Sequence, residues 1–80
     1  MMEQEHMRDA LELLMEFLDA DRIRDRIRIL DLMRPVLTDS LIDTMAVACG
    51  VEVPPADLDT RYLDLKDCLN MISRYELERR

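Results

Sequence analysis

The chain contains one histidine, and its spacing from a nearby glutamate is found in metal-binding helical bundles. His6 follows Glu3 in a Glu-x-x-His pattern, which in di-iron bundles places a carboxylate and an imidazole on one helix face. Such centres need a second motif and further carboxylates from facing helices, and the sequence has no second histidine. The pattern is therefore interpreted as chance spacing, and we expect no metal and no other cofactor.

Two cysteines are the other candidates for metal or redox chemistry. Cys49 and Cys68 are too few for zinc, which takes about four good ligands. Both lie on or beside apolar stripes, where free cysteine behaves as a small hydrophobe. We expect both to be buried and reduced, and a disulfide between the third and fourth helices is the alternative. Because the chain has no recognisable signal peptide, this cysteine content predicts a cytoplasmic protein.

The remaining side chains do not support catalysis. A nucleophile must share one pocket with a base and an orienting group, and His6 would have to supply that base from the first helical turn. The carboxylates follow the spacing of exposed helix faces, so none is isolated in an apolar segment that would raise its pKa. A glycine-rich phosphate loop is excluded by a glycine content of one. We therefore expect a protein that is not an enzyme.

One short pattern resembles a DNA-binding motif. Ala46-x-x-x-Gly50-Val51 resembles the turn of a helix-turn-helix, in which a small residue packs four positions before the turn glycine. Residues 52–59 would then form the recognition helix, but they carry prolines and acids where a major-groove helix needs donors and bases. The pattern is interpreted as a helix C-cap, and nucleic acid is not the expected partner.

The charges are distributed unevenly along the chain, whose net charge is −7. Counted from the sequence, residues 1–20 and 35–60 each carry −5, whereas residues 21–34 and 61–80 carry a net positive charge of 2 and 1. Neighbouring helices that pair opposite charges would explain this pattern, with each exposed pair worth at most about 1 kcal/mol. The alternative is that two oppositely charged surfaces bind a partner or a second copy of the chain.

Under this alternative, binding residues come from the arginine-rich second helix and from the acidic segment after it. Arginine suits such a surface because its guanidinium is weakly hydrated and forms two hydrogen bonds with one carboxylate. The predicted partner-binding residues are Arg22, Arg24, Arg26, Arg28, Asp39, Asp43, Asp57 and Asp59.

The elements that must position these residues are predicted to be amphipathic helices, because apolar residues recur every three or four positions. The four predicted core-facing stripes are Met7, Leu11, Leu14 and Leu18; Ile23, Ile27, Leu30 and Met33; Leu41, Met45, Ala48 and Cys49; and Leu58, Tyr62, Leu65, Leu69, Ile72 and Tyr75. The apolar residues that fall off or beside these stripes, and that we expect to be exposed, are Leu13, Ile29, Leu32, Ile42 and Leu63.

The boundary between the first two helices is predicted at residues 19–21. Asp19 or Asp21 can accept a hydrogen bond from the free N–H groups that begin a helix. One long bent helix is the alternative. Pro35 disfavours helical geometry at Arg34, so the second helix is expected to end there.

The later boundaries follow from capping residues. Thr38, Asp39 and Ser40 form a predicted N-cap cluster, in which Ser40 and Asp43 have the spacing of a weak capping box. Gly50 suits the left-handed position that ends a helix. A short extended segment can follow Gly50. Asp57 or Asp59 then caps the last helix.

Together these features predict an all-α protein, a compact bundle of four to five short helices. Residues 1–80 are expected to form a single helical domain, and because the chain ends without a helix breaker, excision from a longer chain is left open. No apolar run reaches the roughly 18 residues of a membrane span, so no membrane partner is expected.

The predicted function is protein–protein interaction, as an adaptor or self-associating domain whose partner is another protein or a homo-oligomer. The expected binding surface is a Leu/Ile/Met patch with the arginines of residues 22–34 on one side and the acids of residues 35–60 on another. Death-fold adaptor modules are similar in size, in all-helical make-up and in bipolar charge, and this similarity is one of class. The alternative is a small transcriptional or phage-type regulator. It would contact DNA through the Ala46–Gly50 segment, or act as an acidic nucleic-acid mimic.

Overall fold

Four α-helices and one 3-10 turn form the fold. The computed structural model describes residues 2–78, and their side chains from residue 9 to residue 77. The helices are α1 (Met2–Asp19), α2 (Ile23–Met33), α3 (Asp39–Cys49) and α4 (Leu58–Glu78), with the 3-10 turn η1 (Arg34–Val36) after α2. No strand occurs in this range. The predicted all-α bundle is confirmed.

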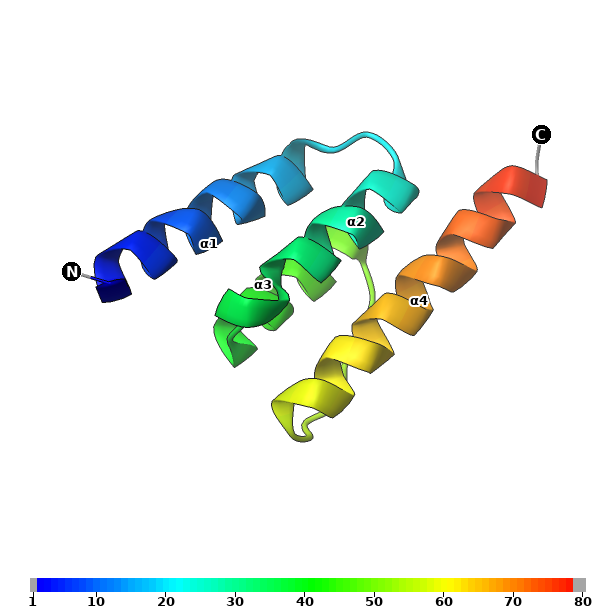
Figure 1. Ribbon diagram of the computed structural model, residues 1–80. Helices are drawn as coiled ribbons and strands as arrows, with labels where there is room; N and C mark the ends of the chain where they lie inside the picture. Colours follow the sequence, from blue (N-terminus) through cyan, green and yellow to red (C-terminus); the bar gives the residue numbers. More distant parts are fainter. Residues whose placement is uncertain (1, 79–80) are drawn as a thin grey trace.

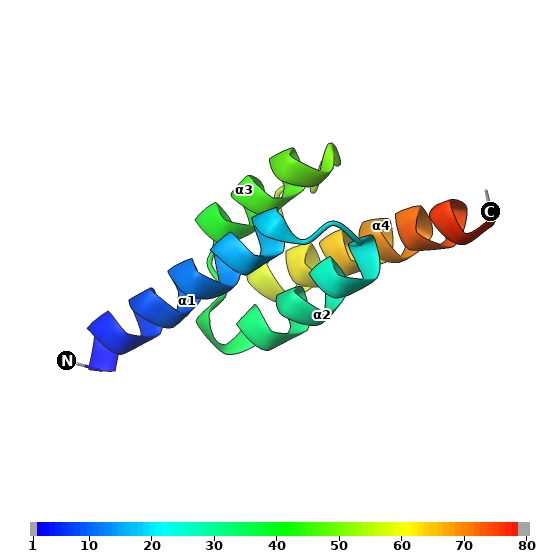
Figure 2. The same cartoon turned by 90° about the horizontal axis from the view of Figure 1, so that it is seen from above.

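The helix α2 is central to the bundle. Both α1 and α4 run antiparallel to it on opposite sides, and α3 lies behind α2 in contact with α1 and α4 (Figure 1). The N-terminal part of α1 and the C-terminal part of α4 extend in opposite directions (Figure 2). The molecule is therefore elongated, with dimensions of 47 × 26 × 17 Å.

The predicted break between α1 and α2 is confirmed, but its capping residue is not an aspartate. The N-cap of α2 is Arg22, whose backbone is extended and whose side chain makes no capping hydrogen bond. Neither Asp19 nor Asp21 has the predicted role. The end of α2 follows the predicted effect of Pro35, because the helix stops at Met33 and the proline continues into η1.

Thr38 caps α3, which confirms the predicted N-cap cluster but not the capping box of Ser40 and Asp43. Its hydroxyl oxygen accepts a hydrogen bond from the Leu41 N–H at 3.2 Å, whereas Ser40 lies inside the helix. Gly50 ends α3 as predicted, with φ at 69°, a conformation that favours glycine. No strand forms after it. The cap of α4 is Asp57, which accepts from the Thr60 N–H at 3.3 Å.

The core lies where the four helices meet. Ala48, Leu58 and Tyr75 were predicted to face it but are exposed, because α3 and α4 extend beyond their neighbours there. The fully buried large side chains come from all four helices and are Phe17, Leu30, Met33, Ile42, Met45, Leu65 and Leu69.

The predicted core face of α1 is wrong: the face that the structure buries is rotated from it by part of a turn. Phe17 is completely buried and Ala10 is buried, whereas the predicted core residues Leu11 and Leu18 are exposed. Met7, which shares the predicted stripe, lies outside the described side chains. Leu14, from the same predicted stripe, is half-buried against the core. The helix therefore faces the bundle with one half of its apolar arc, and the other half faces outward.

The five apolar residues expected to be exposed divide into two groups. Leu32 and Leu63 are exposed, as predicted. Ile42 is fully buried, and Leu13 and Ile29 are half-buried against the core, so those predictions are wrong. The error arises because each helix packs against two or three neighbours, which widens its buried face beyond a single stripe.

Candidate protein-interaction surface

Arg61 joins α3 to α4 through two predicted partner-binding acids. The side chain is nearly buried, and it donates hydrogen bonds to Asp39 at 3.0 Å and Asp43 at 2.5 Å. The two acids are one helical turn apart, so one guanidinium reaches both. The hydrogen bonds to Asp43 and Asp39 raise the pKa of Arg61 above its ordinary value. Asp39 and Asp43 therefore serve the α3–α4 seam.

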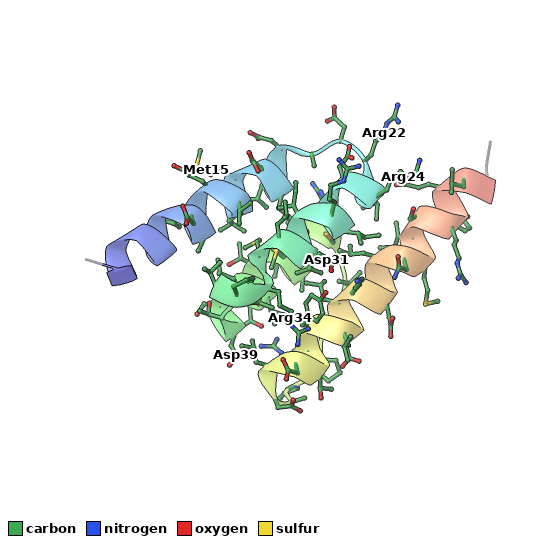
Figure 3. The ribbon with its side chains drawn as sticks, in the orientation of Figure 1. Met15, Arg22, Arg24, Asp31, Arg34 and Asp39 are labelled. Carbon is green, nitrogen blue, oxygen red and sulfur yellow. The ribbon has the colours of Figure 1, made fainter. Side chains whose placement is uncertain are left out.

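Asp31 joins α2 to α4, as Arg61 joins α3 to α4. It accepts hydrogen bonds from the Tyr62 hydroxyl and from the Lys66 ammonium, the latter at 3.0 Å from the nearer carboxylate oxygen. Partial burial raises the pKa of Asp31, but the hydrogen bonds from Tyr62 and Lys66 outweigh it and hold the pKa below its usual 3.8. Figure 3 shows Asp31 on the side of α2 that faces α4.

Arg34 closes the same seam at the N-terminal end of α4. Its guanidinium lies 4.3 Å from the centre of the Tyr62 ring and 2.9 Å from the Asp59 carboxylate. The stacking holds the arginine in place, so the predicted binding residue Asp59 has an intrachain partner. Asp57, another predicted binding residue, caps α4 through Thr60, whose hydrogen bonds lower the pKa of Asp57.

The four predicted arginines have different environments. Arg26 folds back onto the α1–α2 connection, where it donates to the carbonyl of Ala20 at 3.2 Å, and Arg28 lies 3.6 Å from Asp25. The side chains of Arg22 and Arg24 make no hydrogen bond or ion pair with another described residue. They line a small hollow beside the C-terminal end of α4, and Figure 3 shows them projecting there.

The eight predicted residues lie at different places on the molecule, with the arginines apart from the acids. Arg22 and Arg24 lie at one end of α2, whereas Asp39 lies at its other end (Figure 3). Opposite charges pair across the α2–α4 and α3–α4 seams, which was the first of the two explanations for the charge pattern. Arg22 and Arg24 keep their charges available for a partner.

Sequence reasoning missed an apolar surface on α1, here called the α1 stripe. Leu11, Met15 and Leu18 are 53%, 65% and 41% exposed. At about 100° per residue they lie on one side of the helix, and Figure 3 shows Met15 pointing away from the other helices. The sequence does contain a signal of this surface: the apolar residues of α1 cover a larger part of the helix circumference than a single core contact requires.

A groove lies next to the α1 stripe, between α1 and the C-terminal end of α2. Its volume is about 410 Å³. Leu13, Leu32, Pro35 and Val36 form its apolar part, and carboxylates from α1 border it. The lining acids, here called the acidic rim, are Asp9, Glu12 and Glu16.

The cysteines and the histidine add no further chemistry. Cys49 and Cys68 are free thiols and are half-buried rather than buried, and Cys49 accepts a long hydrogen bond from Arg26 at 3.4 Å. The side chains of Glu3 and His6 lie outside the described residues. Among the described side chains, no group of three or more His, Cys, Asp and Glu could hold a metal ion.

The segment after α3 does not continue as a helix-turn-helix. The Val51 N–H donates to the Ala46 carbonyl at 3.0 Å across the left-handed Gly50, which is the C-cap geometry interpreted from the sequence. Residues 51–57 are not helical, so no recognition helix directly follows the turn. Within the described range, no helix is both long and apolar enough to span a membrane.

Comparisons of the chain with protein-family models, with curated proteins and with solved structures give no match. The similarity to death-fold modules accordingly remains one of size, helical content and charge. The functional conclusion below depends on the surface of this molecule.

Proposed function

We propose that this protein is a protein–protein interaction module that binds an amphipathic helix of a partner protein along the outer side of α1. The exposure of Leu11, Met15 and Leu18 on one side of that helix carries the proposal. Three neighbouring aliphatic side chains form a contiguous patch, and exposed patches of this kind mark partner surfaces. A helix is the expected ligand because its own apolar row packs along such a stripe.

Apolar contact alone gives a weak complex. Covering a half-exposed leucine or methionine contributes roughly 1 kcal/mol, and association costs at least 4 kcal/mol of lost freedom. Charge must therefore contribute. Glu12, Glu16 and Asp19 are exposed on the same helix, next to the stripe. The partner helix is expected to carry lysine or arginine beside its apolar row.

The same charges disfavour pairing of α1 with α1 of a second copy. Residues 1–20 carry a net charge of −5. Two stripes packed face to face would bring these acids together, and like charges across an interface are destabilising. A basic partner helix avoids this repulsion.

Photo-crosslinking in cells tests the proposal. A photoreactive amino acid replaces Met15 in one variant and Leu63 in a control variant. Leu63 is a suitable control because it is also exposed and apolar, but lies on α4 away from the stripe. We expect a discrete crosslinked protein from position 15 that is absent from position 63.

The purified crosslinked protein must then bind the wild-type chain directly. The proposal is contradicted if positions 15 and 63 crosslink to the same proteins, or if the protein captured at position 15 does not bind after purification.

The salt dependence of this binding separates the proposal from the acidic nucleic-acid mimic. An interface centred on the α1 stripe is expected to weaken moderately with added salt, because its few ion pairs are screened and its apolar contacts are not. A mimic that occupies a basic groove through many carboxylates would lose affinity steeply. Titration of the partner at about 0.05 and about 0.5 M NaCl distinguishes the two slopes.

A further inference from the structure

We propose that the groove between α1 and α2 binds the basic end of a second copy of the chain, so that molecules associate head to tail. The basic end is the hollow where the N-terminus of α2 meets the C-terminal part of α4. This proposal deepens the proposed function by naming one protein partner. The two proposals share Glu12 and Glu16, but this one uses the apolar floor of the groove in place of the α1 stripe. Its test measures association of the chain with itself, so the two can fail separately.

The groove combines an apolar floor with negative charge. Leu32, on its α2 side, is 59% exposed, and Pro35 next to it is exposed. The acidic rim supplies three carboxylates from one side of α1. None of these three carboxylates forms an ion pair with another described residue, so they are available to an incoming cation. The occupant should therefore be apolar and basic.

The basic end has this composition. Arg22 and Arg24 line the hollow together with Leu77, which is 56% exposed, and neither arginine forms an ion pair with another described residue. Glu76 also lines the hollow, so the two arginines leave its described lining with a net positive charge. An exposed leucine beside arginines matches an exposed leucine across the groove from carboxylates.

The two surfaces lie at opposite ends of the elongated molecule. The groove is at the C-terminal end of α2 and the basic end is at its N-terminus. Figures 1 and 2 show α1 and α4 extending beyond the bundle in these opposite directions. One contact between two copies leaves a groove free on one molecule and a basic end free on the other. Such a heterologous contact continues into longer chains unless a ring closes.

Two double variants test this arrangement by complementation. Glu12→Lys/Glu16→Lys reverses the charge of the groove, and Arg22→Gln/Arg24→Gln removes the charge of the basic end, so that the two altered surfaces are not complementary to each other. All four residues are exposed, so both variants are expected to fold. Sedimentation or light scattering then measures mass from micromolar to millimolar concentration at low salt.

We expect the average mass of the wild type to rise beyond that of a dimer with concentration and to fall when salt is added. Each double variant alone should associate at least tenfold more weakly. An equimolar mixture of the two should form a 1:1 dimer that does not grow, because only one intact groove and one intact basic end remain.

A matched control is Glu52→Lys/Asp67→Lys, which changes the net charge as much as the groove variant but at exposed positions outside both surfaces. It should associate like the wild type. Circular dichroism checks the helix content of every variant. A monomeric wild type at millimolar concentration, a mixture that stays monomeric, or a control that also loses association overturns the proposal. None of these outcomes affects binding at the α1 stripe.

Discussion

Arg61 shows what single residues contribute in this small protein. It lies on the buried face of α4, three residues after Leu58 and four before Leu65. Asp39 and Asp43 are spaced by one turn of α3. A basic residue on an apolar face and two acids at helical spacing were visible in the sequence, but only the packing of α3 against α4 shows that they meet.

Replacing Arg61 with lysine is expected to destabilise the fold. A lysine ammonium is a point charge and cannot span two carboxylates as the planar guanidinium does. The melting temperature of Arg61→Lys should therefore fall below that of the wild type. The matched control is Arg28→Lys, because the Arg28 side chain is 75% exposed and pairs weakly. Equal melting temperatures for all three proteins would show that the two-acid contact contributes nothing.

The contact of Asp31 with Tyr62 and Lys66 predicts a dependence of stability on acid pH. Because the folded pKa of Asp31 is lower than 3.8, the unfolded chain binds more protons near that pH. The stabilisation is present above 3.8 and is lost as the pH falls through the lower folded value.

Asp31→Asn removes this titration. Its free energy of unfolding should decrease less steeply than that of the wild type between about pH 4 and about pH 2. Asp57, whose pKa is also lowered, is the same in both proteins. Urea unfolding at a series of pH values measures the two slopes, and identical slopes would contradict the role of Asp31.

At the scale of elements, helix positions follow from the sequence much better than helix orientations do. Pro35, Gly50 and Asp57 act on the local backbone, so the boundaries they set were predictable. The buried face of α1 was not, because Leu18 and Phe17 belong to one wide apolar arc. The choice between them depends on where α2 and α3 lie, which local spacing does not encode.

Two neighbouring substitutions test the orientation of α1. Phe17→Ala should lower the free energy of unfolding by about 3–5 kcal/mol, because the side chain is completely buried. Leu18→Ala should cost less than about 1 kcal/mol, since Leu18 is 41% exposed. Urea denaturation gives both values. Similar losses for the two variants would mean that α1 packs through the face predicted from the sequence alone.

At the scale of the whole molecule, most charges of α2, α3 and α4 pair within the fold. Asp31, Arg34 and Arg61 each stabilise a seam. The outer side of α1 has no such role and combines exposed apolar residues with carboxylates. The predicted binding surface combined charged residues with a Leu/Ile/Met patch, but Leu11 and Leu18 were assigned to the core. Their exposure is a property of the assembled bundle, which the sequence does not show.

Binding of the crosslinked partner to a variant of the α1 stripe measures this conclusion most directly. Leu11→Glu/Met15→Glu places charge in the centre of the stripe, and Leu63→Glu makes the same kind of change at a matched exposed position on α4. Calorimetric titration of the purified partner should show at least a tenfold loss of affinity for the stripe variant and wild-type affinity for the control. Unchanged affinity of the folded stripe variant would contradict the proposal that α1 is the binding surface.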